Sequence, residues 1–507
     1  MKKEDWIQKL KNYPIKKGKI ESVEWVEKLA PAISILKFVE AKNFYKIIIK
    51  LYPTLDSDIT VLLALPEHKD WNRKFLGVGN GGFAGTVDER LIVSGVKRGY
   101  AVAHTDMGTT PDPDDCIGRP ERWIDFGYRA THLMTLVGKQ IAEFFYGAAL
   151  EHSYFMGGST GGQQAMSEIQ RYPEDYDGII CFSPANNRIR LHSFFVWNWQ
   201  AVHSGKDTIF TEEQVKMLKD EIVQRYGAQA WNAPGDGFLA IPQNISVDVD
   251  KMWEETEIFN EAQRDVLKKL YAGPEDPLTK ERIISGFVPG TEGESLSIMD
   301  ICDKEKFAHG FFYPFRWIWG KDFDFMKFDF HKDLQDAIRK LGPILDAVNP
   351  DISAFRERGG KMIMISGLSD AIIPYGGAEE YYEQVISLQG TQEDSREEKL
   401  YRTKHFFRYF QVPGFAHTFG GPGVQELGNI GLPEVPVDPR HDVLCALENW
   451  VENEKAPECL LATALKDNNL WEKFDHDRPV YAYPDLPRFI SGDPKCKDNY
   501  ERQRIDI

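Results

Sequence analysis

The sequence is poor in the features that mark secreted disulfide scaffolds and membrane proteins. Its 507 residues include six cysteines, which lie far apart and form no CxxC pair, so neither a disulfide framework nor a zinc site is indicated. We expect six reduced thiols. No run approaches the roughly 18 apolar residues of a spanning helix, and the charged first 17 residues lack the apolar core of a signal peptide. As written, the chain is expected to be cytoplasmic and to bind no membrane.

The sequence also has fewer basic than acidic residues. Lysine and arginine number 61 against 78 aspartates and glutamates, a net charge of −17, which gives no positive surface for phosphate backbones or anionic lipids. Hydrophobic residues reach 42% and aromatic residues 12%, so the composition predicts a folded chain long enough for two or three domains. We therefore expect a small-molecule partner and no nucleic acid. Nothing in the sequence sets the oligomeric state.

Short apolar runs alternate with helical stretches on both sides of a long insert. Strands are predicted at residues 33–38, 45–52, 59–65, 74–78, 100–104, 153–156, 178–182, 361–365 and 406–412. Helices are predicted at residues 128–146, 162–170, 211–226, 260–271, 378–388 and 441–454. This alternation predicts an α/β fold with a mostly parallel sheet. The expected division is the first part of an α/β domain at 1–190, a lid domain at 191–345, and the second part of the α/β domain at 346–507.

A serine between small residues follows the predicted strand at 153–156. The run Gly-Gly-Ser-Thr-Gly at 157–161 joins this strand to the next predicted helix, which is the context that a nucleophile elbow requires. Small residues suit this position because the turn is too tight for side chains, and the turn lifts the serine hydroxyl above the sheet edge. An ordinary glycine-rich helix start is the alternative. We predict that Ser159 is a catalytic nucleophile.

A serine nucleophile needs a base, and the base needs a carboxylate that orients it. In this fold class the order along the chain is serine, acid and histidine. Asp370 stands where a loop leaves the strand predicted at 361–365, and its alternative role is a helix cap or turn residue. Of the four histidines that follow, His417 alone lies in a small-residue loop directly after an apolar strand. The other three are His405, His441 and His476. We predict Asp370 as the orienting acid and His417 as the base, with a packed loop histidine as the alternative.

Acyl transfer also needs backbone N–H groups aimed at the developing oxyanion. One is the amide of Thr160, which follows the predicted nucleophile. A second is offered by the glycine-rich loop at 77–85, where Gly82 is the predicted donor. A phosphate-binding loop is the alternative, although the loop has neither a GKS or GKT ending nor GxGxxG spacing.

Two aromatic patches of the lid are suitable walls for a planar ligand ring. They lie at residues 194–199 and 311–319. The candidate substrate contacts are Trp197, Trp199, Trp317 and Trp319. The alternative is that these side chains form the core of the lid.

With these pieces in order, the chain resembles the tannase and feruloyl esterase family over roughly residues 59–483. The matching segments include 71–73, 79–85, 125–130, 145–147, 153–161, 170–173, 177–179, 271–274 and the surroundings of Asp370 and His417. The resemblance implies an α/β-hydrolase fold with a large inserted lid domain and a triad of Ser159, Asp370 and His417. It also implies hydrolysis of aromatic-acid esters, galloyl or feruloyl, through an acyl-enzyme. Two other classes stay open: a non-catalytic binding protein on a hydrolase scaffold, and another serine hydrolase such as a peptidase or C–C hydrolase.

The chain departs from the family's pattern in two places. Family members carry a disulfide between a cysteine just before the serine and one just after the histidine, and here those positions are Gly158 and Thr418. Both cysteines are missing together, which suits a reducing compartment, so we expect catalysis to be retained and the two Cα atoms to lie within about 7 Å. The family's lid often holds Ca²⁺ in an aspartate-rich loop, whereas residues 232–242 retain one Asp-Gly step. A calcium ion needs several carboxylates, so we expect no metal and no cofactor, with lid calcium as the open alternative.

Overall fold

The computed structural model describes residues 2–29, 40–295 and 297–505. Nine strands form its main sheet: β1 (Gly18–Leu29), β2 (Ala41–Leu51), β3 (Ile59–Pro66), β4 (Lys74–Val78), β5 (Ala101–Thr105), β6 (His152–Gly158), β7 (Gly178–Phe182), β8 (Lys361–Gly367) and β9 (Phe407–Val412). They lie in the order β1-β2-β3-β5-β4-β6-β7-β8-β9. The pairs β1–β2, β2–β3 and β3–β5 are antiparallel. The pairs β5–β4, β4–β6, β6–β7, β7–β8 and β8–β9 are parallel. The predicted α/β class with a mostly parallel sheet, the α/β-hydrolase fold, is confirmed.

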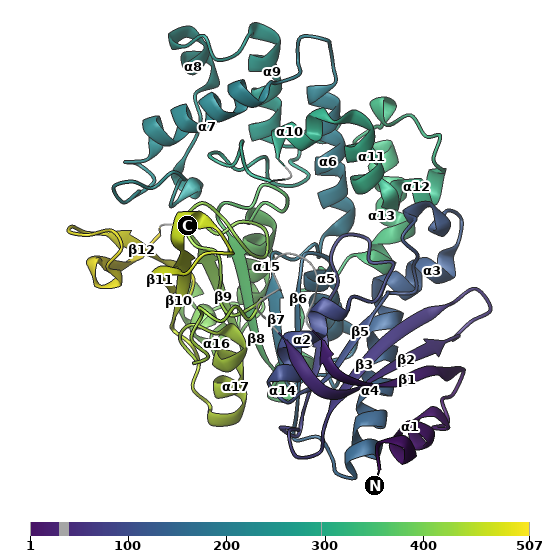
Figure 1. Ribbon diagram of the computed structural model, residues 1–507. Coiled ribbons are helices and arrows are strands. Elements are labelled where there is room, and N and C mark those ends of the chain that lie inside the picture. The colour runs from purple at the N-terminus through teal and green to yellow at the C-terminus, as the bar shows by residue number, and fades with distance from the viewer. Residues whose placement is uncertain (1, 30–39, 296, 506–507) are drawn as a thin grey trace.

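Helices cover both faces of this sheet (Figure 1). They are α2 (Glu89–Lys97), α4 (Ala130–Tyr146), α5 (Thr160–Arg171), α14 (Ser353–Glu357), α15 (Gly376–Ser387), α16 (Arg396–Thr403) and α17 (Val443–Asn453). Successive strand residues point to opposite faces, so Ile179 of β7 belongs to the apolar core with α4 and α5, and Ile180 to the core with α2 and α17. Burial on both faces explains why the central strands read as continuous apolar runs.

The long insert between β7 and β8 is helical. Its helices are α6 (Arg188–Val202), α7 (Glu212–Tyr226), α8 (Val249–Glu255), α9 (Glu261–Ala272), α10 (Ile298–Cys302), α11 (Lys304–Phe311), α12 (Tyr313–Trp319) and α13 (Lys332–Leu345). Figure 1 shows α7 to α10 gathered at one end of the molecule, with α6 running from them toward the sheet. The predicted helices at 211–226 and 260–271 match α7 and α9. The domain boundaries at 190/191 and 345/346 stay a prediction.

The ends of the chain contain structure that the apolar pattern did not reveal. The helix α1 (Lys3–Lys11) and the strand β1 were not predicted, because most β1 residues are exposed or half-buried and alternate with charges. Two hairpins follow α17: β10 (Cys459–Leu465) with β11 (Phe474–Tyr481), and β12 (Asp485–Phe489) with β13 (Tyr500–Arg504). The strand predicted at 33–38 lies outside the described residues. None of the helices within the described ranges is long and apolar enough to cross a membrane.

Candidate active site

Ser159 stands in the sharp turn between β6 and α5. Its φ of 59° and ψ of −117° place it in a conformation that costs energy for a residue other than glycine. The surrounding backbone holds it there, since the Ser159 amide donates to the carbonyl of Phe182 at 3.0 Å and the Ala185 amide donates to the Ser159 carbonyl at 3.0 Å. Glycine is required beside it, because a Cβ at Gly157 would lie 2.5 Å from the carbonyl oxygen of Gly161. This is the local geometry of a nucleophile elbow.

The side chains of Asp370 and His417 are joined by a hydrogen bond in the structure. The Asp370 side chain is fully buried after β8, and its Oδ1 accepts the amides of Ile372 and Ile373 at 2.9 and 3.0 Å. Its Oδ2 accepts a hydrogen bond from Nδ1 of His417 at 2.8 Å. Because a carboxylate only accepts, this contact holds the proton of a neutral imidazole on Nδ1 and leaves Nε2 as the acceptor nitrogen.

The other histidines near the end of the chain have partners elsewhere. Nδ1 of His405 lies 2.8 Å from the carbonyl oxygen of Tyr401. His441 contacts two aspartates, at Nδ1 and at Nε2, and His476 contacts its neighbour Asp475. Of the four candidates, only His417 is joined to Asp370 by a hydrogen bond among the described residues.

A cavity of about 570 Å³ borders both Ser159 and His417. We call it the serine cavity. Its walls are mostly apolar and include Phe83, Leu91, Phe182, Phe311, Ile372 and Phe419. Phe311 comes from α11 of the insert, so the insert contributes part of the wall of this cavity, which also borders the carboxyl end of β6. Within the described chain no hydrogen bond joins the Ser159 hydroxyl to His417 Nε2, a contact that in unliganded enzymes often shortens only when substrate binds.

The glycine-rich loop is locked against the start of α5. The amide of Asn80 donates to Gln164 Oε1 at 2.8 Å, and the Gly161 amide donates to the Asn80 carbonyl at 2.7 Å. The hydroxyl of Thr160 donates to the carbonyl of Gly82, and Gly82 lines the serine cavity. As the first residue of a helix, Thr160 has an amide without an intrahelical acceptor. The predicted donors, Gly82 and Thr160, therefore belong to one connected unit.

A buried arginine behind this loop was missed by the sequence analysis. Arg188 is 2% exposed, and its Nη2 donates to Thr160 Oγ1 at 2.9 Å while its Nε donates to Gln163 Oε1 at 2.5 Å. Its Nη1 donates to the hydroxyl of Tyr313. Within the described part of the chain no salt bridge pairs it with a carboxylate. No sequence pattern distinguishes Arg188 from Arg190, because the partners of Arg188 come from separate segments.

The four tryptophans proposed as substrate contacts lie elsewhere. Indole nitrogens of three of them donate to other parts of the fold: Trp197 to Lys269 O, Trp317 to Pro113 O and Trp319 to Asp336 Oδ2. Trp199 is 5% exposed and packs edge-on against Phe312. None of the four lines the serine cavity. This corrects the expectation: the aromatic patches form lid core, and of their side chains Phe311 is the one that reaches the cavity.

Gly158 and Thr418 are neighbours, as the missing disulfide predicts. A Cβ built on Gly158 would lie 3.1 Å from Thr418 Cβ and 2.7 Å from Thr418 Cγ2. This separation places the two Cα atoms within the roughly 7 Å that a disulfide spans. All six cysteines of the chain are free.

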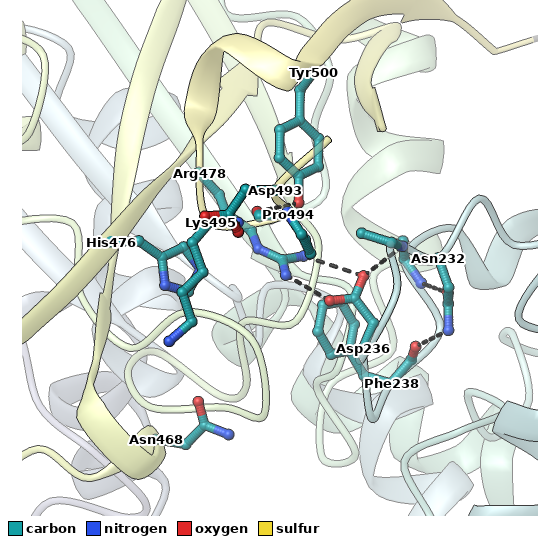
Figure 2. A network of polar contacts seen from close by, with 12 residues as sticks. Asn232, Asp236, Phe238, Asn468, His476, Arg478, Asp493, Pro494, Lys495 and Tyr500 are labelled. Atoms are coloured by element: carbon teal, nitrogen blue, oxygen red, sulfur yellow. Dashed lines mark hydrogen bonds and ion pairs between the residues drawn. The ribbon is translucent and has the colours of Figure 1, made fainter. Parts of the chain in front are cut away.

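The lid loop at residues 232–242 does not suit calcium. Its one carboxylate, Asp236, is bound at both oxygens by the Arg478 guanidinium, at 2.5 and 3.2 Å, and also accepts the Ala233 amide (Figure 2). Asn232 is likewise occupied, because its Nδ2 donates to the Phe238 carbonyl at 2.6 Å. A cation already neutralises the only anionic ligand, so the donor set that Ca²⁺ requires is not present in this loop.

One other cluster groups potential metal ligands among the described residues. Ligand atoms of His132, Glu168 and Asp175 lie within 4.8 Å of one another. His132 Nδ1 is 2.7 Å from Asp175 Oδ2, and burial raises the pKa of Glu168 well above its usual range. A protonated carboxyl is a poor ligand. Glu168 lies on α5 about 13 Å along the helix from Ser159, so this cluster is separate from the serine.

Comparison with known families shows which family the chain belongs to. A sequence profile of the family described as tannase and feruloyl esterase matches residues 46–301 and 305–503. The chain belongs to this family. It is a carboxylic ester hydrolase, and the alternatives of a non-catalytic binding protein and of a peptidase or C–C hydrolase are set aside.

Individual relatives agree with membership of the tannase and feruloyl esterase family. An uncharacterized esterase of Xanthomonas campestris pv. campestris is 32% identical over 459 residues, which cover 85% of this chain and 79% of the relative. Feruloyl esterase B of Aspergillus niger is 27% identical over 432 residues, covering 82% and 78%.

Solved structures support the fold of this family member. The crystal structure of feruloyl esterase B from Aspergillus oryzae has a TM-score of 0.85 at 23% identity, covering 98% of this chain and 100% of that one. Tannin acyl hydrolase from Aspergillus niger has a TM-score of 0.75 at 19% identity, covering 99% and 95%. The likeness extends through the insert and the C-terminal hairpins.

Proposed function

We propose that this family member hydrolyses esters of aromatic acids through an acyl-enzyme on Ser159, with His417 as the base and Asp370 as the residue that orients it. One observation carries the proposal. The elbow at Ser159 and the hydrogen-bonded pair of Asp370 and His417 come from segments more than 200 residues apart in sequence and border a single cavity. A serine, a histidine and a buried carboxylate that hydrogen-bonds to it are what nucleophilic ester cleavage needs.

The proposed reaction has two halves. In the first, His417 Nε2 takes the proton of Ser159 as the hydroxyl oxygen attacks the ester carbonyl, and the amides of Gly82 and Thr160 donate to the oxyanion. His417 then gives the proton to the departing alcohol, which leaves an ester between the acid and Ser159. In the second half, water loses a proton to His417 and attacks this ester, and Ser159 leaves with that proton. Asp370 stays ionised and stabilises the imidazolium in both halves.

The character of the serine cavity supports an aromatic acyl group. Its apolar walls and its volume of about 570 Å³ lie within the range of cavities that bury most of a small ligand. Phenylalanines at its border offer edge and face contacts for a planar ring. The relative from Aspergillus niger is named a feruloyl esterase, which supports the same class. The choice between a gallate and a hydroxycinnamate depends on hydrogen bonds to ring hydroxyls.

The catalytic roles are tested by alanine substitution with methyl ferulate and methyl gallate as substrates. Ser159→Ala and His417→Ala should each lower kcat by about 10³-fold or more, because only the oxyanion donors and binding would remain. His405→Ala and His441→Ala serve as matched controls and should leave kcat within a few-fold of wild type. A large loss of kcat in His405→Ala or His441→Ala, together with near-normal kcat in His417→Ala, would refute the assignment of the base.

Substrate class is tested by a second panel. Methyl ferulate, methyl gallate, p-nitrophenyl acetate and a ferulic acid amide differ in acyl group and leaving group. The proposal expects kcat/KM for one aromatic methyl ester to exceed that for the amide by several orders of magnitude. Preference for p-nitrophenyl acetate over both aromatic esters, after allowance for its better leaving group, would contradict an aromatic acyl site.

A further inference from the structure

A phenylalanine of the lid loop packs against the loop that carries His417, residues 414–423, which we call the histidine loop. The side chain of Phe238 is 1% exposed. Cβ atoms built on Gly414 and Gly423 would lie 2.8 and 2.6 Å from Cζ of its ring. No side chain fits in either gap, so the ring rests directly on the backbone at these two glycines.

The two glycines form the neck of the histidine loop. The amide of Gly423 donates to the carbonyl of Gly414 at 2.9 Å, which joins the two ends of the loop. Within the loop, the Ala416 amide donates to the Gly420 carbonyl at 2.9 Å and encloses His417 in a tight turn. These bonds make the loop a compact unit. A shift at its neck therefore moves the backbone of His417 and, with it, the imidazole.

The direction in which the imidazole points depends on this backbone position. Nδ1 of His417 is bound to Asp370 Oδ2 at 2.8 Å, but one hydrogen bond fixes one atom of the ring and not the direction of the ring. The place of the backbone then decides how far Nε2 lies from Ser159. A misplacement of about 1 Å at a reacting group can lower a rate by about 10²-fold. The contact of Phe238 with the neck therefore bears on the proton transfer.

Phe238 is itself held in place from two directions. Asn232 Nδ2 donates to its carbonyl at 2.6 Å, and Asn232 Oδ1 accepts the Ala240 amide at 2.9 Å, so the backbone of the lid loop is closed around it. The Arg478 guanidinium lies 5.4 Å from the centroid of its ring, within the range of a cation–π contact. The same guanidinium binds both oxygens of Asp236 at 2.5 and 3.2 Å (Figure 2). Because Arg478 belongs to β11, a C-terminal hairpin fixes the ring that rests on the histidine loop.

We propose that Phe238 is a positioning residue for His417. Its ring keeps the neck of the histidine loop at the place from which the imidazole reaches Ser159, and the ion pair of Asp236 with Arg478 keeps the ring there. The proposal rests on the proposed function, because it takes His417 as the base. It gives the lid loop a part in the proton transfer, although the loop supplies no group to the reacting atoms.

Substitution of Phe238 tests the proposal with methyl ferulate as substrate. Phe238→Ala should lower kcat about tenfold or more and leave KM within about twofold, because Phe238 does not line the serine cavity and acts only through the base. Phe238→Met refills part of the space with a flexible apolar chain and should recover most of kcat. A kcat of Phe238→Ala within about twofold of wild type would overturn the proposal.

A serine-directed fluorophosphonate separates a misplaced base from unfolded protein. In this reaction the Ser159 oxygen attacks phosphorus, fluoride leaves as the P–F bond breaks, and His417 takes the hydroxyl proton. Phe238→Ala should label to one equivalent per chain, with a rate constant about tenfold lower than that of wild type. A smaller labelled fraction at an unchanged rate constant would mean loss of folded protein and would overturn the proposal. Absence of label on Ser159 in wild type is a different outcome, because it would refute the proposed function itself.

A second buried phenylalanine of the insert is the matched control. Phe325 is 7% exposed, its ring centroid lies 4.7 Å from that of Phe312 and 5.0 Å from that of Phe323, and it does not line the serine cavity. Phe325→Ala should lower the thermal midpoint, as removal of a buried ring does, and should leave kcat and the labelling rate constant within about twofold of wild type. An equal fall in kcat for Phe325→Ala and Phe238→Ala would indicate a general effect of lid stability and would overturn the proposal.

The contact can also be tested from the side of the histidine loop. Gly423 has no positive φ, so alanine can adopt its backbone conformation, but the new Cβ would lie 2.6 Å from Cε1 and Cζ of Phe238. Gly423→Ala should therefore lower kcat more in the wild-type background than in Phe238→Ala, where the ring is absent. Residues in contact show such non-additive effects, and separate residues do not. A double variant whose loss of kcat equals the product of the two single losses would overturn the proposal.

Discussion

Two cysteines placed at positions 158 and 418 should form a bridge between the serine loop and the histidine loop. The Cβ separation of 3.1 Å is a few tenths of an ångström below the usual 3.5–4.5 Å for a disulfide, so a small shift of one loop is needed. Gly158 has no positive φ, and a cysteine can adopt its backbone conformation, whereas Thr418 already has a φ of 64°. Cysteine at 418 also relieves the β-branch at that strained position.

The size of the effect follows from the length of the closed loop. About 260 residues separate the two positions, for which loop entropy allows up to about 5 kcal/mol of stabilisation. The short Cβ separation stores strain, so we expect about 2–4 kcal/mol, lost on reduction. Activity of the wild type should not respond to reductant, since its six cysteines are free.

Thiol titration and thermal unfolding measure this directly. Oxidised Gly158→Cys/Thr418→Cys should show the six thiols of wild type and a higher midpoint than the same protein after reduction, which exposes two more. Gly158→Cys alone is the control and should show no midpoint change on reduction. A folded, active double variant that fails to lose two thiols under oxidant would refute the placement of Thr418 beside Gly158.

Three further predictions concern pH, metal and the oxyanion loop. Burial raises the pKa of Glu292 from 4.5 to about 7, so the folded protein keeps a proton that the unfolded chain loses, and stability falls as pH rises from about 4.5 to 7. Glu292→Gln keeps an acceptor for the Tyr271 hydroxyl and removes this loss of stability, which amounts to up to about 3 kcal/mol. The thermal midpoint of the variant minus that of wild type should therefore rise between pH 5 and pH 8. A difference in midpoint that stays constant over this range would contradict the prediction. EDTA should change neither activity nor midpoint, because Arg478 occupies the Asp236 carboxylate; a fall of several degrees that Ca²⁺ restores would show that the loop binds metal after all. Arg188→Met should lower kcat for methyl ferulate tenfold or more at similar KM, since it removes the donor to Thr160 Oγ1 and leaves that hydroxyl with Gly82 alone; an unchanged kcat would show that Arg188 has no part in catalysis.

The parts of the site that could be predicted from sequence are those with a local pattern. Ser159 lies in a strand, glycine turn and helix that are contiguous, and the histidine loop directly follows an apolar strand. Asp370 is distinguished by its place at the end of a buried strand. These positions follow from chain order and from parallel strands that end at the same edge of the sheet.

The walls of the serine cavity could not be predicted, because they come from segments that meet only in the folded chain. Phe311 belongs to the insert and Phe419 to the histidine loop. The aromatic patches in the sequence indicated that the lid contains aromatic side chains, but they did not show which of these side chains face the cavity. Trp317, for example, is 1% exposed and belongs to the core. Likewise, Arg188 could not be singled out from sequence, because its hydrogen bond to Thr160 forms only in the folded chain.

The hairpins after α17 show the same limit. Strands β11 and β13 mix charged with apolar residues, so no apolar run stands out in either, whereas β10 is an apolar run that the sequence analysis missed. The hairpin of β10 and β11 is positioned by pairing and by long-range contacts such as Gln425 with Asn468. The position of a loop that depends on such contacts can be seen only in the structure.

The central claim is the acyl-enzyme on Ser159, and mass spectrometry of a quenched reaction tests it most directly. Protein mixed with excess methyl ferulate and stopped in acid within milliseconds to seconds should carry one feruloyl group, on the peptide that contains Ser159. Ser159→Ala should carry none. A feruloyl group on another residue, or labelling that persists in Ser159→Ala, would contradict the account, as would steady turnover without any covalent species across that range of quench times.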